Sequence, residues 1–196
     1  MSTQTRKERE RTERRQRIID AARDLAEAQG WEAVTVRRLA DRIEYSQPVL
    51  YSHFAGKSAI VSAVAEQGFA DLATTLGQAR AGMTGSAERL AGAARAYLDF
   101  AAVNPALYDA MFSMSTDLTF GPEASQPLRD AFGELEAIFR PLVEEADLGA
   151  RAEVAWSALH GLATLERGRR LRPELRERRL ALLVAEWLAA IDVSPA

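Results

Sequence analysis

The chain has 196 residues, of which 47% are hydrophobic and 27% are charged, the balance of an ordinary globular protein. Cysteine is absent, which excludes disulfides and thiolate metal sites, and the two histidines, His53 and His160, are too few for a histidine-rich metal site. We expect neither a metal nor a cofactor. No run approaches ~18 apolar residues and the N-terminus lacks the apolar region of a secretory signal, so we expect a cytoplasmic protein without a membrane span.

The net charge of −3 hides an asymmetry between the two ends of the chain. Residues 1–60 carry 12 basic and 9 acidic side chains, whereas residues 61–196 carry 13 and 19. A basic N-terminal part on an acidic remainder indicates that only the former meets a polyanion. Seven basic residues against three Glu lie between Arg6 and Arg17. They are either the solvated start of a helix or a flexible arm that reaches DNA phosphates or the minor groove.

The first part of the chain predicts a tail followed by a helix. We expect a flexible basic tail over 1–10 and a helix over 11–29, because apolar side chains from Ile18 onward recur on one helical face. Gly30 can end this helix in a left-handed conformation, and Trp31 can fold back onto the last turn.

Two short helices are predicted next. Thr35 is a suitable N-cap for a helix that ends near Ile43 and carries one apolar stripe. Ser46 can cap a further helix over 47–54, with Pro48 in its first turn, where the missing N–H costs little. The two helices are separated by only three residues, which predicts a helix-turn-helix.

The remaining residues also predict helices, because no run alternates polar and apolar side chains as a strand would. Pro141 should kink the helix that contains it. Residues 113–127 contain Gly, Pro and Ser and should form a loop. The fold class is therefore all-α. We expect one long helix from about Lys57, followed by helices over 87–103, about 105–112, 128–146, 150–167 and 173–191.

The second helix of a helix-turn-helix enters the major groove, where its first residues meet base edges. Here the side chain of Gln47 can pair with adenine through two hydrogen bonds, and those of Pro48 and Val49 can touch a thymine methyl. Leu50 and Phe54 are better placed to anchor the helix. Small helical proteins contain similar spacings without binding DNA, so the spacing alone leaves the function open.

The residues from Thr35 to Lys57 carry a more specific pattern: Thr-x-x-x-Leu-Ala, then Ser, then Leu-Tyr-x-His-Phe, then Lys. This stretch resembles the DNA-binding head of the TetR family, and the chain is identified as an AcrR-like member. Glu44 departs from the family pattern, which often has Gly in the turn, and must accept a less comfortable backbone conformation. The resemblance implies that bases are read by Arg37, Gln47, Pro48 and Val49, and that phosphates are held by Thr35, Tyr51, His53 and Lys57.

The rest of the chain carries a less strict resemblance. The runs 104–112 and 156–163 are similar to a C-terminal domain of some TetR-family members that is named for its Trp, His and Gly. The resemblance implies an N-terminal three-helix head on a C-terminal helical bundle. That bundle would bind a small effector and form a homodimer through the last two helices, about 150–167 and 173–191.

Candidate pocket residues are aromatic or Met side chains at helical spacing, so each is either part of a ligand cavity or ordinary core. Trp156 and His160 lie four residues apart and can touch. On the dimer side, the apolar residues at interface-like spacings are Leu183, Val184, Trp187, Leu188 and Ile191. The pocket candidates are Phe100, Tyr108, Met111, Phe112, Phe132, Phe139, Trp156 and His160.

We therefore expect a ligand-responsive repressor, released from palindromic operator DNA by a small hydrophobic effector. The expected domains are 11–56 for DNA binding and 57–196 for effector binding and dimerisation. An architectural or division-control protein without an effector is the alternative, and activator action stays open. An enzyme is disfavoured, because the sequence shows no Gly-rich phosphate loop, no metal-ligand spacing and no catalytic set.

Overall fold

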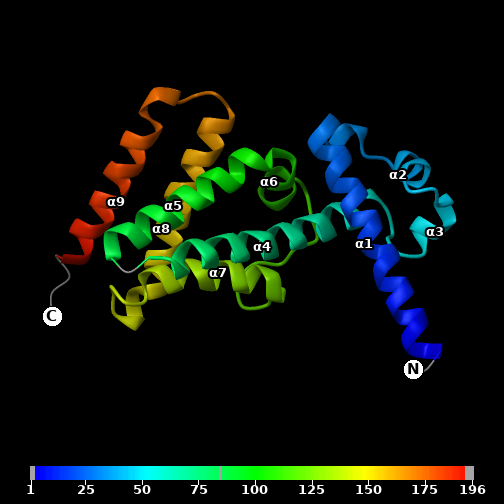
Figure 1. Ribbon diagram of the computed structural model, residues 1–196, viewed down its shortest axis with the longest axis horizontal. Helices are drawn as coiled ribbons and strands as arrows, with labels where there is room; N and C mark the ends of the chain where they lie inside the picture. Colours follow the sequence, from blue (N-terminus) through cyan, green and yellow to red (C-terminus); the bar gives the residue numbers. More distant parts are fainter. Residues whose placement is uncertain (1–2, 84, 193–196) are drawn as a thin grey trace. The chain divides into compact units, whose positions relative to one another are not determined.

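The computed structural model describes residues 3–83 and 85–192 (Figure 1). Over those residues the chain is built from helices and turns, and the all-α prediction is confirmed. No described helix is long and apolar enough to cross a membrane. In chain order the elements are α1 (Thr3–Gln29), the 3-10 helix η1 (Trp31–Ala33), α2 (Val36–Arg42), α3 (Gln47–Tyr51), α4 (Lys57–Ala81), α5 (Ser86–Val103), α6 (Pro105–Phe112), α7 (Gln126–Phe139), α8 (Glu145–Arg167), the 3-10 helix η2 (Pro173–Leu175) and α9 (Arg176–Asp192).

The chain divides into two compact units. The first contains the residues up to Gly68 together with Asn104–Ser125, and the second contains Phe69–Val103 and the residues from Gln126 onward. The sequence placed the boundary after residue 56, but the first unit also includes the start of α4 and the whole of α6. The assignment of DNA binding to 11–56, and of effector binding and dimerisation to 57–196, stays a prediction.

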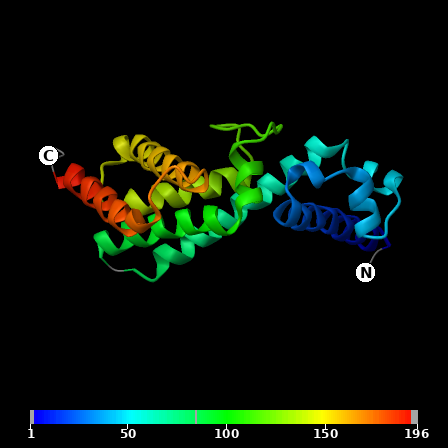
Figure 2. The ribbon, with the colours of Figure 1, turned by 90° about the horizontal axis from the view of Figure 1, so that it is seen from above.

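Helix α1 begins earlier than the sequence indicated. It is helical from Thr3, so the flexible tail predicted over 1–10 is a helix wherever it is described, and residues 1 and 2 lie outside the described residues. From Ile18 onward one face of α1 is buried in the first unit, where α2 and α3 lie together beside it (Figures 1 and 2). Residues 5–17 precede this core and are exposed, apart from the half-buried Glu10.

Two turns near the helix-turn-helix, one after α1 and one after α2, have a positive backbone angle φ. Gly30, which ends α1 as predicted, has a φ of 78°. Glu44, between α2 and α3, has a φ of 55°. An L-residue with a side chain is disfavoured in this left-handed region by about 1–2 kcal/mol because its Cβ crowds the following carbonyl. The turn therefore forms in the expected place with a residue that strains it.

Replacing Glu44 with Gly is expected to raise the free energy of unfolding by about 0.5–1 kcal/mol. The steric penalty at positive φ disappears, and part of the gain is offset by the greater freedom of Gly in the unfolded chain. Urea denaturation checks the change, with Glu32→Gly as the matched control. Glu32 lies in η1 without a positive φ, so its substitution should lower stability. A loss of stability in Glu44→Gly equal to that of the control would contradict the account.

Helix α6 is attached to α1 through its first turn. Pro105 occupies the first position, where no N–H is needed, and the Glu27 carboxylate accepts the next two N–H groups, from Ala106 at 3.1 Å and Leu107 at 2.9 Å. The Trp31 indole N–H donates to the Ala106 carbonyl at 2.8 Å. A negative side chain at a helix N-terminus accepts hydrogen bonds from the free N–H groups and is attracted to the positive end of the helix dipole. These bonds explain why α6 belongs to the first unit.

Glu27→Ala is expected to lower the free energy of unfolding by about 1–2 kcal/mol, because two N–H groups of α6 lose their acceptor. Chemical denaturation measures this loss, and hydrogen exchange should show reduced protection of the Leu107 amide. Glu13→Ala is the control, since the exposed Glu13 pairs with Arg9 at 3.8 Å, and the loss of such a surface pair should be close to neutral. The cap has no special role if both variants lose the same stability.

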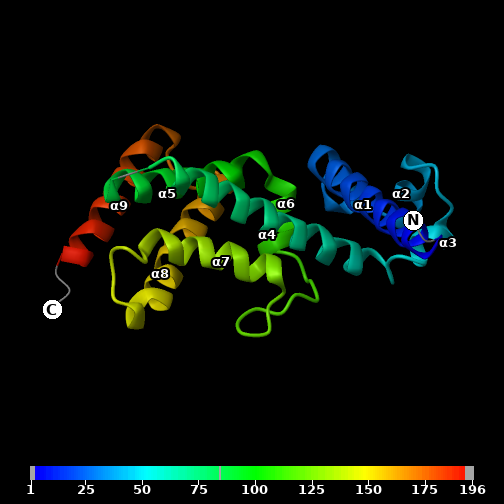
Figure 3. The same cartoon turned by 60° about the horizontal axis from the view of Figure 1, so that its bottom comes forward.

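In the second unit, α5 contacts α7, α8 and α9 (Figure 3). The sequence predicted one kinked helix over 128–146, and this is wrong. Helix α7 ends at Phe139, and Pro141 lies in a turn before α8 begins at Glu145. Pro141 lacks the N–H that a continuing helix needs, so it ends the helix instead of bending it.

Candidate nucleic-acid interface

The helix-turn-helix is held by a capping bond at the start of α2 and by buried apolar side chains. Thr35 occupies the N-cap of α2, and its hydroxyl accepts the Arg38 N–H at 3.2 Å, as predicted. Ser46 is the N-cap of α3, although its side chain forms no capping bond. Leu50 and Phe54 are buried, which confirms that they anchor α3 and its following turn.

The four residues expected to read bases remain accessible. Arg37 on α2 is exposed, and so are Gln47 and Pro48 in the first turn of α3, while Val49 is half-buried. Among the described residues, no side chain bonds to Arg37 or Gln47. The donors and acceptors of both side chains are therefore directed to solvent, as a surface that meets base edges requires.

The four residues expected to hold phosphates differ in their surroundings. Thr35 is exposed, and the Tyr51 side chain is 55% exposed, so its ring does not pack into the core. His53 is half-buried. The Lys57 ammonium donates to the carbonyl of Trp31 at 2.6 Å. An ammonium group has three donors, so this bond positions the charge at the start of α4 and leaves capacity for a phosphate.

His53 lies in a positively charged environment. Burial lowers the pKa of its imidazole, and the charges of Arg11, Arg14 and Arg15 on α1 lower that pKa further. At neutral pH the unbound protein therefore presents a neutral imidazole, which still donates one N–H. A phosphate at this position would favour the charged form instead.

Sequence reasoning left the contacts between α1 and the helix-turn-helix unspecified. The Arg15 guanidinium lies 4.7 Å from the centre of the Phe54 ring, and Arg17 donates to the Tyr45 hydroxyl at 3.3 Å. The cluster of basic residues was visible in the sequence. Which of them contact Phe54 and Tyr45 depends on how α1 packs against the helix-turn-helix, and only the structure supplies that.

The eight candidate pocket residues are divided between the two units. Tyr108, Met111 and Phe112 lie on α6 in the first unit, where the rings of Tyr108 and Phe112 are 4.7 Å apart. The other candidates, Phe100, Phe132, Phe139, Trp156 and His160, lie in the second unit. Their role in binding a ligand stays a prediction.

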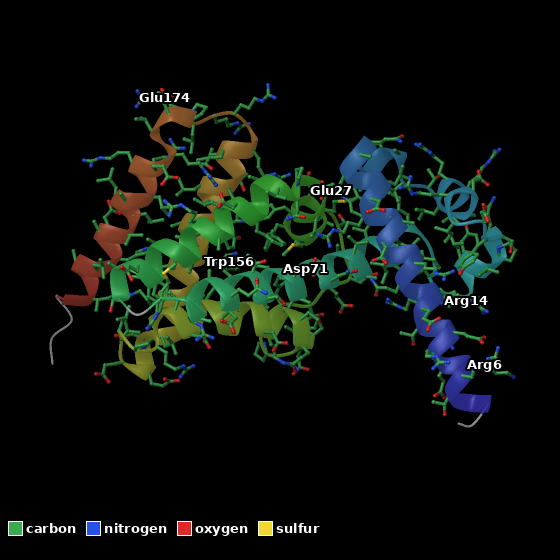
Figure 4. The ribbon with its side chains drawn as sticks, in the orientation of Figure 1. Arg6, Arg14, Glu27, Asp71, Trp156 and Glu174 are labelled. Atoms are coloured by element: carbon green, nitrogen blue, oxygen red, sulfur yellow. The ribbon has the colours of Figure 1, made fainter. Side chains whose placement is uncertain are left out.

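Within the second unit the aromatic side chains form specific contacts. Trp156 and His160 are neighbours with ring centres 6.3 Å apart, as their spacing indicated. The Trp156 indole also donates to the hydroxyl of the buried Tyr97 at 3.1 Å, and this partner was missed. Burial lowers the pKa of His160, and the charge of Arg167 lowers it further. Figure 4 labels Trp156 among the side chains of this unit.

The second unit also has an open groove of about 620 Å³ between α4 and α7. None of the predicted pocket residues lines it. Its walls carry small residues such as Gly77 and Gly133, and the Arg80–Glu134 ion pair at 3.0 Å lies beside them. The candidate pocket and this groove are therefore different places.

The last two helices present apolar side chains to solvent. Val154 and Leu165 lie on one face of α8 and are 59% and 37% exposed, and Leu182 on α9 is 49% exposed. The sequence named Val184 and Trp187 for the interface, but both are buried inside the unit, where Trp187 packs edge-on against Phe139 at 5.6 Å. The exposed residues replace them as candidates for contact with a second subunit.

Two family models match this chain. The model for the bacterial regulatory proteins of the tetR family matches residues 18–64, which contain the helix-turn-helix. The model described as Tetracyclin repressor-like, C-terminal domain, matches residues 90–187, half of the chain. The chain belongs to the TetR family.

The TetR-family assignment agrees with individual relatives. The transcriptional activator FasR of Mycolicibacterium smegmatis is 34% identical over 90 residues, which are 46% of this chain and 41% of FasR. The chain therefore spans less than half the length of this relative. The AcrR-like and Trp-His-Gly subtypes stay predictions.

Solved structures share the TetR-family fold. BioQ in complex with its double-stranded DNA operator superposes with a TM-score of 0.64 at 23% identity, and the match covers 89% of this chain and 98% of BioQ. A TetR variant from Acinetobacter baumannii in complex with minocycline also gives 0.64, at 17% identity, over 89% of this chain and 94% of that protein. At these identities the likeness establishes the fold.

Proposed function

We propose that this TetR-family DNA-binding regulator is a dimeric repressor that leaves a palindromic operator when a small hydrophobic effector binds. One observation carries the DNA-binding part of the proposal. Gln47 and Pro48 are exposed at the start of α3, while the buried side chains of Leu50 and Phe54 anchor that helix and its following turn in the core. This is the arrangement by which a recognition helix presents its first turn to the major groove.

In this proposal Arg37, Gln47, Pro48 and Val49 meet base edges. The charged and polar side chains at the margins of α2 and α3 hold the backbone on either side, because phosphate contacts set the register of a protein on DNA. BioQ, which shares the fold, was crystallised on its operator, and this supports the same use here. The phosphate contacts are assigned to Thr35, Tyr51, His53 and Lys57.

The homodimer is assigned to α8 and α9. Exposed apolar side chains on both helices support this, because association would remove their apolar surface from water. A two-fold dimer also matches the symmetry of a palindromic operator.

The effector is assigned to residues 57–196, whose aromatic residues suit an apolar ligand. The complex of a fold neighbour with minocycline supports a small-molecule site. The effector would favour a shape of the protein that binds the operator less tightly, and its preference for that shape sets the size of the response. Helix α4 is one route for this change, since its residues belong to both units.

Activator action is the second candidate, because the relative FasR is named as an activator. A reporter gene behind the protein's own upstream region separates the two functions. Deletion of the protein should raise expression if it represses and lower it if it activates.

The test of DNA binding is a titration of purified protein against its own upstream DNA and against a shuffled sequence, over a series of salt concentrations. The proposal predicts selective binding whose affinity falls steeply with salt, because each phosphate contact releases counterions. Equal affinity for both sequences would favour an architectural role and contradict the repressor.

A further inference from the structure

The N-terminal part of α1 is a charged helix that has no core of its own. Residues 5–17 carry seven basic side chains and three Glu, a net charge of +4. Ahead of Ile18 none of these side chains is buried. Figure 4 labels Arg6 and Arg14 on this segment, which continues past the other helices of the first unit. A helix that is polar on every side buries no apolar face, so packing does not explain why this segment carries so many charged side chains.

Four of the basic residues share one face of this segment. Lys7, Arg11 and Arg15 recur every four residues, which places them in a line along the helix. Arg14 lies beside that line, three residues after Arg11. Ile18, the first buried residue of α1, continues it. The basic stripe, defined as Lys7, Arg11, Arg14 and Arg15, therefore extends the face by which α1 joins the core.

On the side of the helix away from the basic stripe, two basic side chains are paired with acidic ones. Arg6 is bonded to Glu10 at 2.9 Å, and Arg9 lies 3.8 Å from Glu13. Glu10 also lies 3.8 Å from Arg14, so one member of the stripe is partly compensated. No ion pair involves Lys7, Arg11 or Arg15 within the described residues.

The stripe begins at the helix-turn-helix. Arg15 stacks on Phe54, next to His53, with 4.7 Å between guanidinium and ring centre. Burial lowers the pKa of His53, and the charges of Arg11, Arg14 and Arg15 lower that pKa further, so these three charges act at the imidazole. The residue expected to hold a phosphate and the first members of the stripe are thus neighbours.

We propose that the basic stripe is a second DNA-binding surface, which contacts the sugar-phosphate backbone beyond the segment read by α3. At a rise of ~1.5 Å per residue, the distance from Arg15 to Lys7 is about 12 Å. Phosphates follow one another along a DNA strand at ~3.4 Å of helix axis, so a stripe of this length can meet more than one of them. It contributes affinity and register without sequence preference. The inference rests on the proposed function, because α3 must place the backbone beside His53.

The test compares two double variants that lose the same charge from the same helix. Lys7→Ala/Arg11→Ala removes two members of the stripe, and Arg6→Ala/Arg9→Ala removes two basic residues from the other side. All four side chains are exposed, so both variants should fold, and circular dichroism and thermal unfolding verify this. The readout is the dependence of the logarithm of the binding constant on the logarithm of salt concentration, for upstream and shuffled DNA.

Loss of two phosphate contacts should reduce the steepness of this salt dependence by about 1.8, at ~0.9 per contact. We expect that reduction in the stripe variant on both DNAs, with selectivity retained, and a clearly smaller one in the control. Equal changes in both variants, or no change in the stripe variant, would overturn the inference and leave the proposed function intact. If the wild-type protein binds no DNA, the proposed function fails and the stripe with it.

Discussion

Replacing Gln47 with Ala should lower the affinity for the selective upstream site by about 5- to 150-fold, which corresponds to ~1–3 kcal/mol for one bidentate base contact. Gln47 is exposed in the first turn of α3, where its amide has both a donor and an acceptor to offer. Affinity for shuffled DNA should change little, because phosphate contacts dominate there. Fluorescence anisotropy with the two DNAs measures both values.

Gln78→Ala is the matched control for Gln47→Ala. Gln78 is an exposed glutamine on α4 in the second unit, so its loss removes the same chemical group away from the helix-turn-helix. It should leave both affinities unchanged. If Gln47→Ala kept its full selectivity, α3 would not read the operator through this residue.

Replacing Leu182 with Asp should convert the dimer into monomers and lower operator affinity by about 100-fold or more. A charge at this exposed apolar position on α9 would be buried without a partner in the interface. Each head would then bind its half-site alone and lose the advantage of two linked contacts, which is ~100- to 10,000-fold in multivalent systems. Sedimentation velocity and anisotropy on the same samples measure both effects.

Met83→Asp provides the control, since Met83 is another exposed apolar side chain but lies between α4 and α5. It should remain dimeric and bind DNA as the wild type does. A Leu182→Asp protein that is still a dimer would place the interface elsewhere than on α9. Val154→Asp then tests α8 in the same way.

The helix-turn-helix could be predicted because its determinants are local. Thr35 caps α2 from the adjacent position, Leu50 and Phe54 repeat at helical spacing, and the strain at Glu44 follows from its place in a short turn. Interactions between residues three or four apart are written directly in the order of the chain.

The contacts that the sequence did not reveal join residues far apart in the chain. Glu27 caps α6 across about 80 positions, and Trp156 finds Tyr97 across 59. Neither pairing leaves a periodic signal, because it depends on how helices pack together. For the same reason, the sequence did not reveal that the candidate pocket residues belong to two units. It also did not reveal that Trp187 is buried against Phe139.

The early start of α1 has a different physical reason. Residues 3–10 contain no apolar side chain, so periodicity gave no sign of a helix there. Pairs of opposite charge four residues apart, such as Arg6 with Glu10 and Arg9 with Glu13, stabilise a helix without a core.

The account is tested most directly by a footprint of the wild-type protein on the DNA upstream of its own gene. The account predicts two protected half-sites related by two-fold symmetry, with centres separated by one helical turn of about 10 base pairs or a multiple of it. The same experiment with Gln47→Ala should lose this protection at equal protein concentration. Protection spread evenly along the fragment, or a single site without an inverted repeat, would contradict a dimeric repressor that reads a palindrome through α3.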